Sequence, residues 1–260
     1  MLSEKTGAAG RTLLLAGGGL RQLYTAAALA EKYRVYLAGA EDGTLPAGVT
    51  DAAALKGAAD ALVLPMPVPP DTEAGQLSAL LERLKPGGCV LGGRIPQAVR
   101  GIAEKAGFSV CDYAAEESFI LRNAVPTAEG AISIAMQALP ETVSGMRCLI
   151  LGGGRVSAAL QTRLSALGAE VTAAARSRAD RARAEARGVR AVPLAQLDEL
   201  LPAYSLIINT IPALILTEPL LAEIRRDALV MDLASKPGGV GVGDRNRAGT
   251  DCTEKNGSIQ

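Results

Sequence analysis

The sequence predicts an α/β protein built from two doubly wound domains, each a parallel sheet with helices on both faces. Short apolar runs alternate with stretches of helical spacing along most of the chain, as in successive strand–helix units. The same opening occurs twice, at residues 12–40 and 147–176: an apolar run, three glycines, a helical stretch and a second apolar run. The 260 residues, 48% of them hydrophobic, suffice for two domains of about 120 to 130 residues each.

The first half of the chain divides into alternating strands and helices. Apolar runs predict strands at residues 12–16, 34–38, 62–64, 89–91 and 108–112. Helical spacing predicts helices at residues 20–32, 73–84 and 96–106. The proline-rich segment 65–71 ends one strand, and residues 85–88 form a turn. A further apolar segment at 119–121 is a candidate to complete the sheet.

A hinge at residues 123–127 and a helix at 128–139 separate the two halves in this interpretation. The second half then has predicted strands at 147–151, 170–175, 191–193, 206–209 and 228–232, with helices after the glycine turn and at 194–201 and 217–224. After Gly239 the sequence has no strand or helix pattern. We expect a first domain over residues 1–124, a hinge and connecting helix over 125–145, a second domain over 146–239 and an irregular tail over 240–260.

Composition excludes several function classes. The 27 basic and 27 acidic residues cancel, so no global field favours nucleic acid or an anionic membrane. No apolar run approaches the roughly 20 residues that a membrane helix needs, and the first residues lack the pattern of a signal peptide. The four cysteines form no CxxC pair, which suits a reducing compartment. We expect a soluble cytoplasmic protein without nucleic-acid or membrane partners.

The chain contains no histidine. This absence excludes every Ser-His-Asp or Cys-His arrangement and any histidine acid or base within the chain. Histidine zinc sites are excluded too, and the scattered cysteines offer no thiolate substitute, so no metal site is expected. Proton chemistry is left to Lys, Glu, Asp, Tyr, solvent or another polypeptide, and no catalytic base can be assigned.

The second glycine turn carries most of the dinucleotide-binding fingerprint. In Gly152-x-Gly154-x-x-Ser157, only the third position departs from glycine or alanine, and serine is the next smallest residue. Such a turn lets a phosphate approach the backbone at the positive N-terminal end of a helix. We expect a pyrophosphate on Gly152, Gly154, Arg155 and Val156. The alternative is an ordinary α/β turn with no ligand.

The tip of the following strand favours NADP over NAD. An NAD-binding unit usually has an acid about 20 residues on, whereas Glu170 lies at the wrong end of the strand. The tip carries Arg176, Ser177 and Arg178, which suit a 2′-phosphate, with no carboxylate expected there to repel it. The alternative is that Arg176 begins a solvated basic helix.

Polar residues follow two later strands of the second half. Ligands bind outside the carboxyl ends of parallel strands, so we expect these residues to border a nicotinamide: Asn209, Thr210, Pro212, Asp232 and Ala234. The first glycine turn, 17–19, lacks comparable strand ends and is interpreted as the substrate side, although taken alone it fits an NAD site.

Three residues are candidates for substrate contact. Arg21 follows the first glycine turn and is a candidate carboxylate clamp or an ordinary exposed arginine. Lys236 is a candidate to hold a carboxylate or to move a proton, or else a surface lysine. Glu129 lies on the helix that we expect to pack beside a cleft between the two halves of the chain.

Six segments together resemble one family, the A-type subunits of dipicolinate synthase: GGGLRQ, LPMPVPPD, VPTAEGAI, LGGGRV, NTIP and DLASKPGG, spread over residues 17–239. The resemblance implies two Rossmann-like domains similar to the formate/glycerate and alanine dehydrogenases. It also implies oxidation of dihydrodipicolinate, a small dicarboxylate, to pyridine-2,6-dicarboxylate (dipicolinic acid) with NADP. The implied partner is the B-type subunit of dipicolinate synthase, and the implied location is the mother-cell cytoplasm during sporulation. Aromatisation provides driving force, so the lack of histidine is tolerable.

The segment after Gly239 departs from the family pattern, which leads us to expect an atypical or truncated C-terminus. Two alternative functions stay open. One is another NAD(P)-dependent dehydrogenase of an amino or hydroxy acid. The other is a partner protein that binds nucleotide without catalysis. A homo-oligomer is compatible with either, and the sequence does not fix the oligomeric state.

Overall fold

A computed structural model describes residues 10–17, 19–40, 44–70, 72–235 and 238–240, together with the backbone of 252–254. The chain divides into two compact units, Met1–Phe119 with Gln260 and Ile120–Ile259. Each unit contains one six-stranded sheet, and every strand pairing found within the two sheets is parallel. Within the described residues, no helix combines the length and apolarity required to cross a bilayer.

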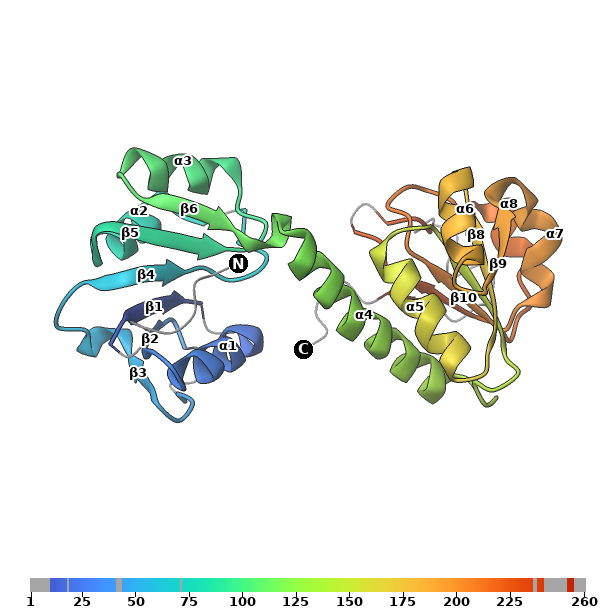
Figure 1. Cartoon of the computed structure of the whole chain (residues 1–260), viewed down its shortest axis with the longest axis horizontal. Coiled ribbons are helices and arrows are strands. Elements are labelled where there is room, and N and C mark those ends of the chain that lie inside the picture. The colour runs from blue at the N-terminus through green and yellow to red at the C-terminus, as the bar shows by residue number, and fades with distance from the viewer. Residues whose placement is uncertain are drawn as a thin grey trace. The chain divides into compact units, whose positions relative to one another are not determined.

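The first unit is a doubly wound sheet with strand order β3-β2-β1-β4-β5-β6, which can be followed in Figure 1. Its strands are β1 (Thr12–Ala16), β2 (Arg34–Ala38), β3 (Val49–Asp51), β4 (Ala59–Val63), β5 (Leu84–Gly92) and β6 (Ser109–Asp112). Its α-helices are α1 (Leu20–Ala30), α2 (Ala74–Leu81) and α3 (Gln97–Lys105).

Helices cover both faces of this sheet, which explains why its central strands are continuous apolar runs. Leu15 and Leu37 pack with Ala26 of α1 on one face. Leu14 and Leu62 pack with residues of α2 and α3 on the other face. Because both faces of the sheet are buried, polar side chains can reach solvent only at the edges formed by the carboxyl or amino ends of its strands.

The second unit repeats this arrangement with strand order β12-β11-β10-β7-β8-β9. Counted from its first strand, that is the 3-2-1-4-5-6 order of a dinucleotide-binding fold, as in the first unit. Its strands are β7 (Arg147–Leu151), β8 (Glu170–Ala175), β9 (Arg190–Pro193), β10 (Leu206–Asn209), β11 (Leu229–Asp232) and β12 (Cys252–Glu254). Its α-helices include α5 (Arg155–Ala166), α6 (Arg178–Glu185), α7 (Leu197–Leu200) and α8 (Glu218–Ala222). The predicted fold class is confirmed.

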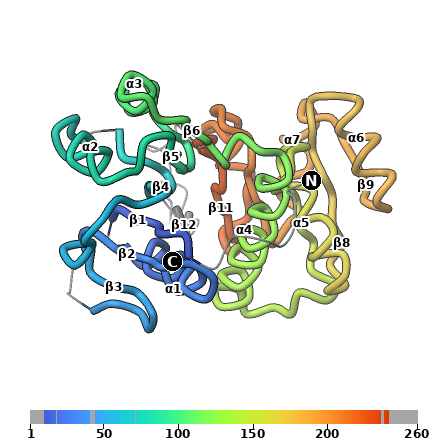
Figure 2. The backbone as a smooth tube through the Cα atoms, turned by 60° about the vertical axis from the view of Figure 1, so that its left-hand side comes forward, coloured from blue at the N-terminus to red at the C-terminus, as the bar shows by residue number. Residues whose placement is uncertain are grey.

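A long helix, α4 (Glu117–Ala138), packs on the second sheet beside α5, as Figure 2 shows. Ala128, Ala131 and Ala135 of α4 are buried against the same core cluster as Leu160 and Leu164 of α5. On the opposite face, α7, α8 and the fully buried Tyr204 cover the sheet. The Tyr204 hydroxyl donates a 2.8 Å hydrogen bond to Thr172 Oγ1, which satisfies both buried groups.

The hinge expected at residues 123–127 is wrong. Residues 117–138 form one continuous helix with Pro126 in its interior, and the apolar segment 119–121 lies in this helix rather than in a strand. Buried alanines and Ile132 follow one another at helical spacing along α4, and this packing outweighs the amide hydrogen bond that proline cannot make. The Thr127 hydroxyl donates to the Asn123 carbonyl at 2.9 Å beside the proline.

The strands differ from the predictions at three places. The expected turn at residues 85–88 lies inside β5, because Ala59 pairs with Leu84 and Ala61 with Cys89, which leaves the intervening residues of β5 looped out. The three-residue edge strand β3 was not expected from its sequence. The tail was expected to be irregular, yet Cys252–Glu254 forms β12, which pairs with β11 in parallel.

Replacing Pro126 by alanine is expected to stabilise α4. The substitution restores an amide donor inside a helix, and we expect a gain of about 1–2 kcal/mol after the entropy that proline removes from the unfolded chain is allowed for. Thermal unfolding and amide exchange of α4 measure the effect. Thr127→Ala is the neighbouring control, with a change within about 0.5 kcal/mol expected for an exposed site. An unchanged or lowered stability of Pro126→Ala contradicts the prediction.

Candidate functional site

The carboxyl ends of β7, β8, β10 and β11 meet at one edge of the second sheet, where the glycine turn joins β7 to α5. Gly152 has φ +115°, in the region that favours glycine, and its amide donates to the Ala174 carbonyl at 2.9 Å. A Cβ at this position would overlap the Thr210 side chain. Thr210 is held there because its hydroxyl donates to the Leu151 carbonyl at 2.7 Å. The turn is therefore fixed by both neighbouring strands.

Gly153 and Gly154 have different reasons to be glycine. A Cβ at Gly153 would overlap the Asp180 side chain, whereas a Cβ at Gly154 would meet no heavy atom within 4 Å. Gly154 is the N-cap of the 12-residue helix α5, and no side chain caps this helix end. The open space beside an uncapped helix N-terminus is the geometry that a phosphate group requires.

Ser157, the departure from the fingerprint, joins the turn to the helix. Its buried hydroxyl donates to the Gly152 carbonyl at 2.7 Å and accepts from Gln161 Nε2 at 3.0 Å. Serine therefore keeps the close helix–strand approach that the third position serves, and it adds a hydrogen bond that glycine cannot make.

A buried hydrogen-bond network connects the ends of β10 and β11. Asn209 is fully buried and donates from Nδ2 to Asp232 Oδ1 at 2.9 Å. The Asn209 side chain also bonds the backbone of Ile211 in both directions, at 3.0 and 3.1 Å. Asp232 further accepts from the amides of Ala234 at 3.1 Å and Gly239 at 2.8 Å. The side chains of Asn209 and Asp232 therefore hold the backbone that follows β10 and β11 in place.

Gly239 closes this network. A Cβ there would overlap Asn209, and the Gly239 carbonyl accepts from the amides of Ile215 and Leu216 at 2.9 and 3.0 Å. Gly239, the last residue of this motif, therefore packs onto the loop that follows β10. Among the predicted nicotinamide neighbours, Thr210 and Ala234 are half-buried and Pro212 is exposed. Lys236 lies outside the described residues.

The tip of β8 carries exposed cations. Among the described residues, the side chains of Arg176 and Arg178 have no hydrogen-bond or ion-pair partner. Ser177 is the N-cap of α6, and its Oγ accepts from the amides of Ala179 and Asp180 at 3.1 and 3.4 Å. Because Oγ accepts these bonds, its proton stays available to a ligand oxygen. Arg181 supports the tip by donating to the carbonyls of residues 175 and 176, both at 2.9 Å.

One acid near the turn was missed. We expected no carboxylate in this region, but Asp180 in the first turn of α6 lies against Gly153 and is paired with Arg183. The sequence carries a weak signal of it, an acid in a helix that follows the strand tip. The ion pair with Arg183 reduces the repulsion that this carboxylate exerts on a bound anion.

The glycine turn of the first unit begins in the same way as that of the second. Gly17 has φ +94°, and its amide donates to the Ala38 carbonyl at 2.9 Å, as Gly152 does to Ala174. The third fingerprint position is different, because Gln22 stands where the second unit has Ser157. Gln22 is buried and donates to the Val63 carbonyl at 3.1 Å. A residue of this size is outside the fingerprint, which marks the second turn as the better dinucleotide site.

The remaining predicted substrate residues occupy different units. Arg21 is exposed in α1 of the first unit and donates from Nη1 to the Met66 carbonyl at 2.5 Å. Glu129 is exposed in α4 and accepts from Arg163 Nε of α5 at 3.2 Å. The acid is therefore engaged by a neighbouring helix of its own unit.

Among the residues that the structure describes, neither a metal-ligand cluster nor an ionised thiol lies at the turn. Within the described residues, no group of three or more metal-ligating Cys, Asp or Glu side chains occurs. Cys148 is buried in β7, and burial raises the pKa of its thiol to about 12, so it stays protonated at neutral pH.

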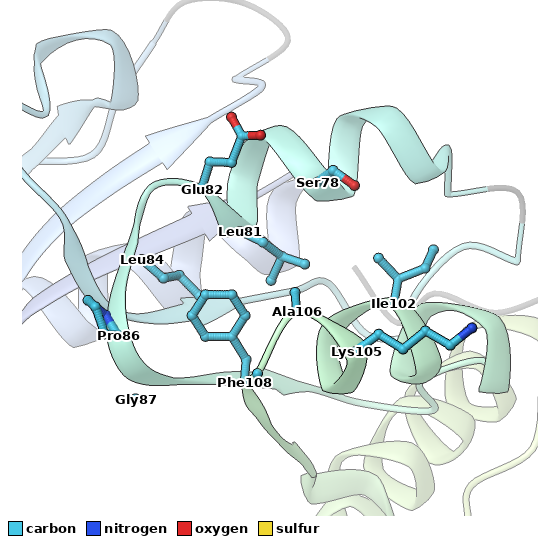
Figure 3. Close-up of a pocket in the computed structure, with 11 residues that line it drawn as sticks. Ser78, Leu81, Glu82, Leu84, Pro86, Gly87, Ile102, Lys105, Ala106 and Phe108 are labelled. Carbon is cyan, nitrogen blue, oxygen red and sulfur yellow. The ribbon is translucent and has the colours of Figure 1, made fainter.

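A hollow of about 730 Å³ in the first unit lies away from the glycine turn. It is formed by the C-terminal ends of α2 and α3 and the start of β5, at the amino edge of the sheet. Figure 3 shows Phe108, Leu81 and Leu84 around it, with Lys105 at its side. Ligands of such sheets bind at the carboxyl edge, so we do not assign the site to this hollow.

Comparison with known families divides the chain in the same way as the fold. Residues 12–114 match the N-terminal domain of the A-type subunit of dipicolinate synthase. Residues 121–232 match the NAD binding domain of the D-isomer specific 2-hydroxyacid dehydrogenases. The second unit therefore carries a dehydrogenase-type domain for a nicotinamide cofactor, and the match includes the glycine turn and the Asn209–Asp232 network.

Individual relatives support the same resemblance. The A-type subunit of dipicolinate synthase from Bacillus subtilis is 34% identical over 155 residues, which are 59% of this chain and 52% of the relative. The matched part thus spans about half the length of that relative. The crystal structure of the Bacillus halodurans counterpart has a TM-score of 0.79 at 26% identity and covers 95% of this chain and 90% of that one. The corresponding Bacillus subtilis structure has a TM-score of 0.75 at 25% identity, with coverages of 95% and 88%.

Two alanine substitutions separate folding from binding at the turn. Gly153→Ala is expected to destabilise the second unit by about 1–3 kcal/mol, because its methyl group overlaps Asp180. Gly154→Ala has open space and is expected to fold with a loss of a few tenths of a kcal/mol. A dinucleotide phosphate bound at this helix end would meet the methyl group, so we expect the affinity for a nicotinamide dinucleotide such as NADPH to fall roughly tenfold or more, about 1.4 kcal/mol.

Thermal unfolding and NADPH fluorescence titration measure these effects. Equal stability of the two variants would contradict the packing of Asp180 on the turn. Unchanged NADPH affinity of Gly154→Ala would contradict the placement of the pyrophosphate.

Proposed function

We propose that the protein oxidises dihydrodipicolinate to pyridine-2,6-dicarboxylate with NADP, because its first half matches the N-terminal domain of the A-type subunit of dipicolinate synthase and a crystal structure of such a subunit covers 95% of this chain. The observation that supports this most is the presence in one chain of that family's N-terminal domain and a dehydrogenase-type NAD-binding domain. We further propose that it acts with the B-type subunit of that enzyme, in the mother-cell cytoplasm of a spore-forming bacterium.

The proposed cofactor position uses the carboxyl edge of the second sheet. The pyrophosphate rests on Gly152, Gly154, Arg155 and Val156, because the turn is open at Gly154 and α5 has no side-chain cap. The ribose 2′-phosphate is bound by Arg176 and the Ser177 hydroxyl. The exposed guanidinium group of Arg176, which has no partner among the described residues, supports this choice over NAD.

The nicotinamide borders Thr210, Pro212 and Ala234 in this proposal. The side chains of Asn209 and Asp232 are hydrogen-bonded to each other and to the backbone. In this proposal they therefore position the loops and do not contact the nicotinamide ring. Among the described residues, no free acid or base lies in this network, which suits a reaction that needs little proton transfer at the cofactor.

NADP supplies the hydride acceptor for this reaction. Bound NADP would take the hydride that dihydrodipicolinate loses, the accompanying proton would pass to solvent or a base, and the product would be an aromatic ring. Because aromatisation favours the product, the lack of histidine is compatible with this reaction. Its own residues bind and orient the substrate: Arg21 holds a carboxylate, and Glu129 and Lys236 stay proposed contacts.

The second candidate is a D-2-hydroxyacid dehydrogenase, favoured by the family match of residues 121–232. These enzymes use a histidine to protonate the carbonyl, and the chain has none. Turnover separates the two candidates. The full chain, mixed with the B-type subunit, is expected to form NADPH from NADP and dihydrodipicolinate but not from 2-hydroxy acids. Turnover of a 2-hydroxy acid instead, or nucleotide binding without any hydride transfer, contradicts the proposal.

Charge reversal at the β8 tip tests the cofactor assignment. Arg176→Glu is expected to weaken NADPH binding about tenfold or more, since a hydrogen bond to a charged group contributes about 1.5–3 kcal/mol, and to leave NADH nearly unchanged. Arg190→Glu, an exposed arginine at the amino end of β9, is the matched control and is expected to affect neither. Equal losses for both nucleotides in Arg176→Glu would overturn the 2′-phosphate assignment.

A further inference from the structure

The loop after β5 contains a strained residue. Arg94 has φ +55°, and among the described residues it is the one non-glycine residue with positive φ. Residues other than glycine rarely adopt this backbone conformation. Where they do, the surrounding structure enforces it, and such residues are concentrated at ligand-binding sites. A glycine would adopt it without cost, so the arginine side chain needs a reason of its own.

Asp112 at the end of β6 enforces the conformation. Its Oδ1 accepts from the amides of Arg94 and Ala114, both at 3.0 Å, and its Oδ2 accepts from the amide of Ile95 at 2.9 Å. The carboxylate thus faces backbone donors. No hydrogen bond or ion pair of the Arg94 side chain occurs within the described part of the chain, and Arg94 is exposed. Two hydrogen bonds, from the amides of Arg94 and Ile95, therefore hold the backbone that carries the Arg94 side chain, while its guanidinium group has no partner among the described residues.

The Arg94 loop is connected to Arg21 through Met66. Gly93 has no room for a side chain because Met66 packs on it, and its carbonyl accepts from the Val68 amide at 3.1 Å. The Met66 carbonyl in turn accepts from Arg21 Nη1. Arg21 lies in the first turn of α1, which follows β1, and Arg94 lies in the loop after β5; β1 and β5 flank β4 in the sheet. Two exposed guanidinium groups therefore belong to one edge of the first sheet.

Tyr113, beside Asp112, lies at the same edge. Burial raises the pKa of its hydroxyl, and the positive charge of Arg21 partly opposes this shift. The Tyr113 ring contacts Phe119 edge-on, with ring centroids 5.1 Å apart. Tyr113 is thus neutral near pH 7, and it leaves the positive charge of this edge undiminished.

We infer that Arg94 is a substrate-binding residue that holds one carboxylate of a small dicarboxylate while Arg21 holds the other, and that Asp112 positions Arg94. The inference rests on the proposed function, which supplies a substrate with two carboxylates. Two guanidinium groups match two carboxylates in charge and in hydrogen-bonding geometry. The fixed backbone at Arg94 lowers the ordering cost of binding.

Binding of pyridine-2,6-dicarboxylate to the full chain with NADPH, measured by calorimetry, tests the inference. Arg94→Gln is expected to weaken binding tenfold or more, and Arg94→Lys by less. Arg94→Gly relieves the strained backbone, so its unfolding midpoint is expected to equal or exceed that of the wild type while the affinity falls as in Arg94→Gln. For pyridine-2-carboxylate, which has one carboxylate, we expect Arg94→Gln to lower the affinity by a smaller factor. Lys105→Gln, a cation at the opposite edge, is the control and is expected to bind as the wild type does.

Asp112→Asn tests the positioning role. It is expected to weaken dicarboxylate binding in the wild-type background and to have no further effect in Arg94→Gly, with NADPH affinity unchanged in both. Wild-type affinity in Arg94→Gln, or equal losses for the mono- and dicarboxylate, overturns the inference and leaves the proposed function intact. Absence of dicarboxylate binding and turnover in the wild type overturns both.

Discussion

The buried hydrogen bond between Asn209 and Asp232 is the interaction on which the candidate cofactor site depends. It joins the ends of β10 and β11, and the remaining atoms of both side chains bond the backbones of Ile211, Ala234 and Gly239. These bonds set the path of the loop that begins at Thr210, and Thr210 in turn limits Gly152 to glycine. Each buried polar atom that the network uses has a hydrogen-bond partner, so the network leaves none of them unsatisfied. It therefore converts two strand ends into one rigid edge beside the glycine turn.

The two units share a strand order and the start of a glycine turn but differ in the side chains around that turn. Both glycine turns make the same hydrogen bond to the neighbouring strand. In the second unit, Ser157 keeps the helix close to the strand, and exposed arginines stand at the next strand tip. In the first unit, the buried Gln22 fills the corresponding space, and Arg21 is directed to the Met66 carbonyl. The proposed division of the chain between cofactor and substrate thus rests on side chains rather than on topology.

The sequence predicts the sheets well because glycine turns and fully buried strands leave strong local signals. It failed at Pro126, where tertiary packing of the α4 alanines outweighs a local helix breaker. It failed at β12, a three-residue strand whose pairing with β11 has no pattern of its own. At the site, Gly152 and Ser157 were recognisable from spacing. Asp180 and Arg94 were not, because the contact with Gly153 and the positive φ arise from chain segments distant in sequence.

The central claim is that the dinucleotide rests on the turn of the second unit. Hydrogen–deuterium exchange of the full chain with and without NADPH tests it most directly, since amides that contact phosphate become protected. We predict protection at the start of α5 and at the β8 tip, residues 153–158 and 176–181, with the first turn, residues 17–23, unchanged. Protection confined to residues 17–23 would contradict the account, because it would place the cofactor on the unit that we assign to substrate.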